Sequence, residues 1–149
     1  MHNGEDPAAE HNASSRRDDK LVGKPNVALM GAMGSGKSQV GWHLARAIGF
    51  SFIDLDREVE VMAGKSVAKI FAEDGESQFR DWERQALDRF ADIKSHVIAL
   101  GGGTVTDPDN WDTIQHFATT IWLNTTPAEI ARRLVSDREQ IRVRPLLAE

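Results

Sequence analysis

Two aspartates, Asp54 and Asp56, stand two residues apart in the segment FSFIDLDREVE, directly after a short apolar run. Side chains of a strand alternate between its faces, so both carboxylates would point the same way if the strand continues that far. Two like charges held side by side repel each other. The pair therefore predicts a bound cation, or a carboxylate that accepts a proton. The alternative is an acidic first turn of a helix from Arg57, which the helix dipole favours, and for the pair taken alone it is the stronger interpretation.

A glycine-rich stretch, GAMGSGKS from Gly31 to Ser38, matches G-x-x-x-x-G-K-[ST] at every fixed position, between an apolar run and a helical pattern. Glycines let backbone N–H groups crowd around phosphate oxygens, and the helix N-terminus adds positive potential. Lys37 is predicted to reach the β- and γ-phosphates of a nucleotide, and the Ser38 hydroxyl to bind Mg²⁺. A plain glycine turn is the less favoured alternative. The predicted nucleotide-binding residues are Gly34, Ser35, Gly36, Lys37, Ser38 and Gln39.

The loop does not identify the substrate, because GTPases, motor ATPases and small-molecule kinases share it. The guanine-reading pattern N-K-x-D is absent, and the apolar run 97–100 ends in glycines instead of the acidic pair of a Walker B strand. Asp54 is therefore the candidate for the metal, directly or through water. Asp56 would accept a hydrogen bond from a hydroxyl nucleophile, because phosphoryl transfer depends mostly on positioning and charge neutralisation.

Two further features have both a structural and a functional interpretation. Arg80, in GESQFRDWE, either forms a surface ion pair with Asp81 or Glu83 or grips a substrate carboxylate at two points. The glycines at 101–103 either form a turn or let a substrate approach the backbone closely.

The elements that must position these residues alternate along the chain. Apolar runs predict four strands, at 27–30, 50–54, 97–100 and 120–123. Helical spacing, capping residues and glycine or proline boundaries predict helices at 38–48, 57–63, 66–74, 76–94, from 108 onward and 126–135. This order predicts an α/β fold in three layers, with a parallel sheet covered by helices on both faces. Ligands in such folds bind beyond the carboxyl ends of the strands, where the glycine-rich loop, the aspartate pair and the triple glycine fall.

Composition narrows the class further. The 149 residues are enough for one domain, and the absence of cysteine excludes disulfides and thiolate sites. A net charge of −5 argues against non-specific nucleic-acid binding, and no apolar run has the length of a membrane span. Residues 1–24 are polar, lack the apolar core of a secretory signal and are too acidic for a transit peptide, so they are predicted to be a disordered tail before a domain at 25–149. A cytoplasmic location is the expectation.

Taken together, these segments resemble the shikimate kinase family. The resemblance is carried by LMGAMGSGKSQVG, FIDLDREVE, IFAEDGESQFRDWE, VIALGGG and RPLLAE, in order and spacing from residue 26 to residue 149. The P-loop is shared with thousands of proteins, whereas the D-x-D, G-E-x-x-F-R and G-G-G set is much more specific. The resemblance implies a P-loop kinase fold of the nucleoside monophosphate kinase type, and transfer of the ATP γ-phosphoryl group to the 3-hydroxyl of shikimate.

The resemblance also implies roles on the nucleotide side. Lys37 and its loop would bind the ATP phosphates, and Ser38 would bind Mg²⁺. Asp54 matches the position that holds the hydration shell of that ion. Arg144 matches a lid arginine near the ATP phosphates.

On the acceptor side, Asp56 matches the residue that binds the phosphorylated hydroxyl and is the proposed base. Arg80 matches a clamp on the shikimate carboxylate, and Gly102 and Gly103 match backbone contacts to substrate hydroxyls. The catalytic residues implied by the resemblance are Lys37, Asp56 and Arg144.

The chain departs from the family pattern toward its C-terminus. The segment 134–143 is longer than the usual lid, which leaves Arg138 and Arg142 unassigned, and the pattern normally continues past Glu149. That continuation supplies a second carboxylate-binding arginine, a fifth strand, an adenine-contacting loop and a final helix. The 149-residue chain is therefore expected to bind ATP–Mg²⁺, to phosphorylate shikimate poorly and to associate through an open sheet edge, whereas a complete protein is expected to be monomeric. The alternatives are a non-catalytic relative that binds nucleotide and a kinase for another polyol acid such as gluconate.

Overall fold

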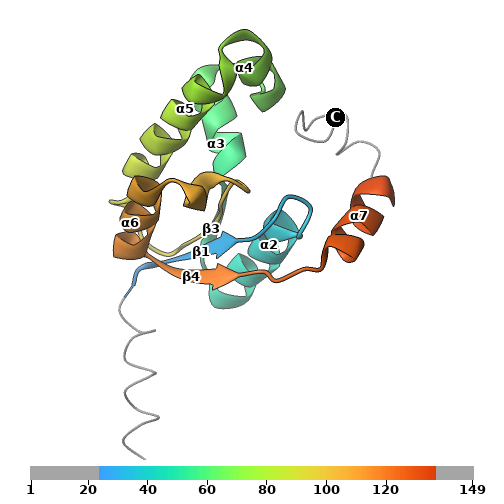
Figure 1. Cartoon of the computed structure of the whole chain (residues 1–149). Coiled ribbons are helices and arrows are strands. Elements are labelled where there is room, and N and C mark those ends of the chain that lie inside the picture. The colour runs from blue at the N-terminus through green and yellow to red at the C-terminus, as the bar shows by residue number, and fades with distance from the viewer. Residues whose placement is uncertain (1–23, 137–149) are drawn as a thin grey trace, which may run out of the picture.

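The computed structural model describes residues 24–136 (Figure 1). One sheet is formed by four parallel strands in the order β2-β3-β1-β4. The strands are β1 (Asn26–Met30), β2 (Ser51–Asp54), β3 (His96–Ala99) and β4 (Ala118–Trp122). The chain moves outward from β1 to β2 and then returns across β1 to β4, so the carboxyl ends of β1 and β3 form the crevice where ligands of such folds bind.

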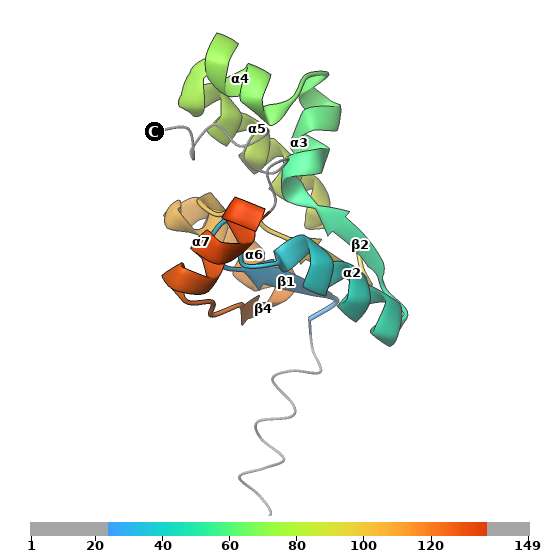
Figure 2. The same cartoon turned by 90° about the vertical axis from the view of Figure 1, so that its right-hand side faces the viewer.

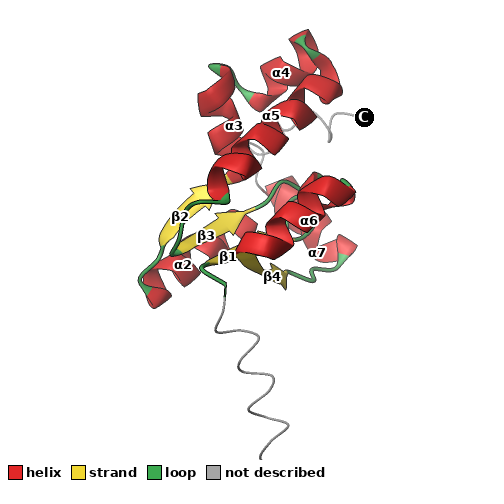
Figure 3. Ribbon diagram, turned by 90° about the vertical axis from the view of Figure 1, so that its left-hand side faces the viewer, coloured by secondary structure: helices red, strands yellow, loops and turns green. Residues whose placement is uncertain are grey.

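Helices pack on both faces of this sheet. They are α2 (Lys37–Ile48), α3 (Leu55–Ala63), α4 (Val67–Glu73), α5 (Gly75–Phe90), α6 (Pro108–Phe117) and α7 (Pro127–Ser136), and a short 3₁₀ turn, η1, covers Thr104–Thr106. Figure 2 shows α2 and α7 on one side of the sheet, and Figure 3 shows α6 on the other. The helices α3, α4 and α5 stand together beyond the carboxyl end of β2.

Two separate apolar clusters explain the three layers. Leu29 and Val97 pack with Ala45 of α2 on one face of the sheet. Their strand neighbours Ala28 and Ile98 belong to the larger cluster on the opposite face, which includes residues of α3, α5 and α6. Alternate residues of a buried strand point to opposite faces, so strands that are apolar throughout require helices on both sides. The predicted fold class is confirmed.

The start of α3 and the end of α5 differ from the prediction in ways that bear on the site, whereas the strand ends differ by at most two residues. β2 ends at Asp54 and α3 begins at Leu55, because the Asp54 carboxylate accepts a hydrogen bond from the Asp56 amide (3.1 Å) and caps the helix. The helix α5 ends at Phe90, four residues earlier than predicted. Beyond it, Nδ2 of the buried Asn26 side chain donates a hydrogen bond to the Ile93 carbonyl (2.7 Å), and its Oδ1 accepts one from the His96 amide (3.0 Å) at the start of β3.

None of the helices within residues 24–136 is long and apolar enough to cross a membrane. The predicted tail and the end of the predicted lid, residues 1–23 and 137–149, lie outside the described residues. The division of the chain at residue 25 and the cytoplasmic location therefore stay predictions.

Candidate functional site

A cavity of about 1180 Å³ opens at the carboxyl ends of β1, β2 and β3. Its walls come from segments far apart in the sequence: the glycine-rich loop, the start of α3, the facing side of α4 and α5, the loop after β3 and one side chain of α7. Most of the residues predicted from the sequence line it, namely Gly34, Ser35, Gly36, Lys37, Ser38, Gln39, Asp54, Asp56, Arg80, Gly102 and Gly103. Arg144 lies outside the described residues, as do Arg138 and Arg142.

Lys37 is the first residue of α2, and its side chain turns back over the glycine-rich loop. Its ammonium group donates hydrogen bonds to the carbonyls of Gly31 (2.7 Å) and Ala32 (2.9 Å), and only 9% of the residue is exposed. The loop therefore holds a buried cation beside the amides at the start of a helix, which is the arrangement that binds phosphate groups.

Ser38 and Asp54 meet although they come from different elements. The Ser38 hydroxyl donates a hydrogen bond of 2.5 Å to Asp54 Oδ2, while Asp54 Oδ1 caps α3. Both side chains line the cavity. Hydroxyl and carboxylate oxygens are ligands that Mg²⁺ prefers. The parallel sheet explains how they come together, since Asp54 ends β2 and Ser38 follows the loop after β1.

Asp56 lies in the first turn of α3, so the acidic helix turn is correct as a description of the backbone. Both aspartates nevertheless line the cavity. The helical turn and the predicted functional role of the pair are therefore compatible. A Cβ atom added to Gly101 would lie 3.0 Å from Asp56 Oδ1, and 2.8 Å from both Glu83 Oε1 and Thr104 Oγ1. The Asp56 carboxylate is thus packed against the glycine loop, where a side chain at residue 101 has no room.

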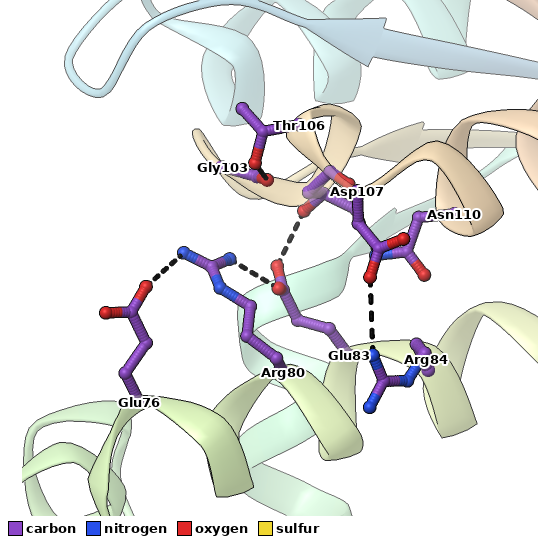
Figure 4. Close-up of polar contacts among 9 residues, drawn as sticks. Glu76, Arg80, Glu83, Arg84, Gly103, Thr106, Asp107 and Asn110 are labelled. Atoms are coloured by element: carbon purple, nitrogen blue, oxygen red, sulfur yellow. Dashed lines mark hydrogen bonds and ion pairs between the residues drawn. The ribbon is translucent and has the colours of Figure 1, made fainter.

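Arg80 of α5 is held between two carboxylates of its own helix (Figure 4). Nη1 donates to Glu83 Oε2 (2.5 Å) and Nη2 to Glu76 Oε1 (3.1 Å). Burial lowers the pKa of the Arg80 guanidinium, but the hydrogen bonds and charges of Glu83 and Glu76 raise it, and the net shift is upward. The group is therefore a permanent cation in the cavity wall, which suits it to an anionic ligand.

The ion pair predicted for Arg80, with Asp81 or Glu83, forms with Glu83, although the Glu83 side chain is buried and not at the surface. Glu83 is a partner, but Asp81 instead pairs with Arg84. Adjacent residues of a helix point in different directions, whereas residues three and four apart lie on the same side, so Asp81 cannot serve Arg80.

The sequence analysis considered Glu83 only as a surface partner of Arg80, and Gly101 only as part of the triple glycine, but both belong to the wall of the site. The Glu83 side chain is fully buried and accepts a hydrogen bond of 2.6 Å from Thr104 Oγ1 as well as the Arg80 pair. The available signal was a glutamate in the apolar stripe of α5, between Phe79 and Leu87. A buried charge requires partners, so such a position indicates a specific pair.

The glycine loop packs closely on both neighbouring walls. A Cβ atom at Gly103 would lie 2.7 Å from Arg80 Nη2, and one at Gly102 would lie 3.5 Å from the backbone nitrogen of Met33 in the P-loop. The predicted pair Gly102 and Gly103 therefore lies between the arginine and the phosphate-binding loop.

Arg133 of α7 is a further cation at the cavity that was not predicted. Its Nη1 donates to the Ser35 carbonyl of the P-loop (3.2 Å), and its Nε donates to Glu129 Oε1 (2.7 Å). Hydrogen bonds from Arg132 and Arg133 hold the pKa of Glu129 below its usual value. The helix α7 is thereby attached to the P-loop backbone.

A sequence model described as shikimate kinase matches residues 33–149. A shikimate kinase of Persephonella marina is 43% identical over 122 residues, which are 82% of this chain and 72% of that protein. One of Synechococcus sp. (strain RCC307) is 46% identical over 123 residues, which are 83% of this chain and 61% of that protein. Across the curated relatives compared, the alignment spans between 59% and 72% of the relative's length.

The solved structures that resemble this chain also include shikimate kinases. The shikimate kinase from Acinetobacter baumannii in complex with shikimate has a TM-score of 0.73 and 30% identity, with 87% of this chain and 80% of that chain covered. The shikimate kinase from Bacteroides thetaiotaomicron has a TM-score of 0.75 and 37% identity, with coverages of 82% and 68%. A gluconokinase from Sinorhizobium meliloti, at 19% identity and a TM-score of 0.53, shares the fold alone and does not favour gluconate as a substrate.

Proposed function

The chain belongs to the shikimate kinase family, and from that premise we propose that the protein transfers the γ-phosphoryl group of ATP to the 3-hydroxyl of shikimate. Membership confirms the family predicted from the sequence, and this family consists of ATP-dependent kinases. The observation that carries the proposal is a single cavity lined by a P-loop lysine, two aspartates and an arginine. These are the groups that a phosphoryl transfer to an anionic alcohol requires.

On the nucleotide side, the P-loop amides and Lys37 would hold the phosphates of ATP. The residues present fit a magnesium ion, because Ser38 and Asp54 supply oxygen ligands and Mg²⁺ is usually held by one or two carboxylates together with phosphates and water. Within residues 24–136, no three His, Cys, Asp or Glu side chains lie together as a metal site. The proposed magnesium site has a single carboxylate, that of Asp54, and does not require such a group. When bound, the ion would neutralise charge on the phosphate oxygens.

On the acceptor side, Asp56 would accept the hydrogen bond of the attacking hydroxyl. As the new bond between the hydroxyl oxygen and phosphorus forms and the bond to the ADP oxygen breaks, the hydroxyl proton passes to the Asp56 carboxylate. Arg80 would bind the substrate carboxylate, while the backbone of Gly102 and Gly103 would contact its remaining hydroxyls. Arg144 is proposed as the lid cation near the phosphates.

A coupled assay of ADP release tests the proposal directly. We expect ADP release from ATP–Mg²⁺ to depend on added shikimate, with shikimate 3-phosphate identified by phosphorus NMR. Gluconate at the same concentration is the control for the alternative substrate class. Nucleotide binding without shikimate-dependent release would favour the non-catalytic alternative.

Replacing Arg80 with lysine should raise the KM for shikimate about 5- to 50-fold, because lysine keeps the charge but loses the planar two-point contact. The KM for ATP should change little. Initial rates at varied shikimate and at varied ATP separate the two constants. Arg84→Lys is the matched control, since Arg84 lies one turn further along α5 and pairs with Asp81 and Asp107 outside the cavity. Equal rises in both KM values would assign Arg80 to the phosphates or to folding.

Replacing Glu76 with glutamine should instead lower the KM for shikimate. Glu76 is exposed and is the outer carboxylate on Arg80, so an anionic substrate approaches an arginine that already carries two negative neighbours. Removing an exposed charge of this kind is worth about 0.2–1 kcal/mol, which corresponds to about 1.5- to 5-fold in KM. Glu73→Gln removes another exposed charge, which pairs with Lys65, and it should leave the KM for shikimate unchanged. A higher KM in Glu76→Gln would show that Glu76 supports the arginine rather than competes for it.

A further inference from the structure

One buried hydrogen bond joins the loop after β3 to the arginine of α5. Thr104, in the turn η1, is fully buried, and its Oγ1 donates to Glu83 Oε1 over 2.6 Å. The other oxygen of the same carboxylate accepts from Arg80 Nη1 over 2.5 Å (Figure 4). Each oxygen of a fully buried glutamate therefore has a separate partner, one from each wall of the cavity.

This geometry points to Thr104 as a positioning residue for Arg80, and the inference rests on the function proposed above. A carboxylate held at one oxygen alone can rotate about its terminal bond, whereas one held at both oxygens has a fixed plane. The Glu83 carboxylate in turn fixes the guanidinium that it contacts. Two-point binding of a substrate carboxylate depends on the orientation of that guanidinium plane. The threonine hydroxyl thus acts on the substrate through two intervening groups.

Thr104 is itself held rigidly, so it can transmit an orientation. Its amide donates to the Gly101 carbonyl (3.3 Å), and its carbonyl accepts from Asn110 Nδ2 (3.2 Å). The same hydroxyl lies 2.8 Å from the position that a Cβ atom of Gly101 would take. The glycine loop and the arginine clamp are therefore one connected unit, and a shift of either is passed to the other.

Thr104→Val tests the inference, because valine keeps the shape and loses the hydroxyl. We expect the shikimate Kd, measured by calorimetry, and the shikimate KM to rise about 5- to 50-fold, because a buried carboxylate oxygen loses its donor. The KM for ATP should stay within about twofold, as the phosphate-binding wall is untouched. Thr104→Ser retains the hydroxyl and should recover most of the affinity. Thr113→Val, a loss of a threonine hydroxyl on α6 outside the cavity lining, is the matched control.

The methyl ester of shikimate distinguishes positioning of the clamp from general loosening of the site. The ester carries no carboxylate and should bind more weakly than shikimate. Because it does not use the arginine clamp, its Kd should be the same for wild type and Thr104→Val. If Thr104→Val does not fold, Thr104→Ala makes the same deletion without the added methyl group, and an unchanged ATP affinity shows that its fold is intact.

The outcomes separate the inference from the function on which it rests. Wild type that binds and phosphorylates shikimate, with Thr104→Val binding it equally well, overturns the inference and leaves the function standing. The inference is also overturned if Thr104→Val loses the same affinity for shikimate and for its ester, or if Thr104→Ser does not recover the affinity for shikimate. Wild type that binds no shikimate overturns the proposed function, and the inference with it.

Discussion

Asp56→Asn should lower kcat about 10²- to 10⁴-fold, which is the usual effect of removing a positioned proton acceptor. Asparagine has nearly the same shape as aspartate, but its amide nitrogen donates hydrogen bonds and its oxygen does not take up a proton. Asp56 lies in the first turn of α3 and packs against Gly101. A side chain of the same shape should keep this packing and leave the backbone in place. The shikimate KM should change far less than kcat, because the proposed carboxylate clamp, Arg80, is unaltered.

The neighbouring aspartate is the control for this result. Asp54→Asn should mainly raise the Mg²⁺ concentration needed for half-maximal rate, because Asp54 contacts Ser38 and is proposed to face the metal. Titrating Mg²⁺ at saturating ATP and shikimate measures both effects in one experiment. Near-full kcat in Asp56→Asn at saturating shikimate would contradict the assignment of the proton acceptor.

Lys37→Ala should abolish turnover, or abolish nucleotide binding if the protein is a non-catalytic relative. Removing one preorganised donor to developing charge commonly costs about 10²- to 10³-fold in kcat, and here the buried cation of the P-loop is removed as well. Calorimetry with ATP–Mg²⁺ and the coupled assay measure the two losses separately. Lys69→Ala, an exposed lysine of α4, should behave as wild type in both. Equal affinity and turnover in wild type and Lys37→Ala would exclude a phosphate-binding role for this loop.

The features that could be predicted from the sequence are those that depend on residues close together in the chain. The P-loop is contiguous, so its residue pattern specifies both the turn and the start of α2. The meeting of Ser38 with Asp54 also followed from the sequence, because parallel strands bring their carboxyl ends to one edge. The start of α3 was misplaced because Asp54 fits both an alternating strand and a helix cap, and the hydrogen bond to the Asp56 amide decides for the cap.

What could not be predicted depends on packing between distant segments. Thr104 and Glu83 are 21 residues apart, and their contact exists because α5 packs beside the loop after β3. Arg133 reaches the Ser35 carbonyl across 98 residues, which requires the placement of α7 over the P-loop. The pairing of Asp81 with Arg84 is different, since helix geometry alone would have excluded Asp81 as a partner of Arg80.

The residues proposed for the nucleotide and those proposed for the acceptor lie in separate parts of the chain, which matters for the evolution of new kinases. The P-loop lies between β1 and α2, and Lys37 begins α2, whereas the proposed proton acceptor and the proposed arginine clamp lie within one uninterrupted stretch, residues 55–90, beyond the carboxyl end of β2. Such a stretch can diverge between relatives while the P-loop stays the same, provided that its apolar side chains still pack against Ala28 of β1 and Ile98 of β3. The hydrogen bond from Thr104 to Glu83 crosses the boundary of that module. A chimaera that imports residues 55–90 therefore has to bring a compatible residue 104 with it.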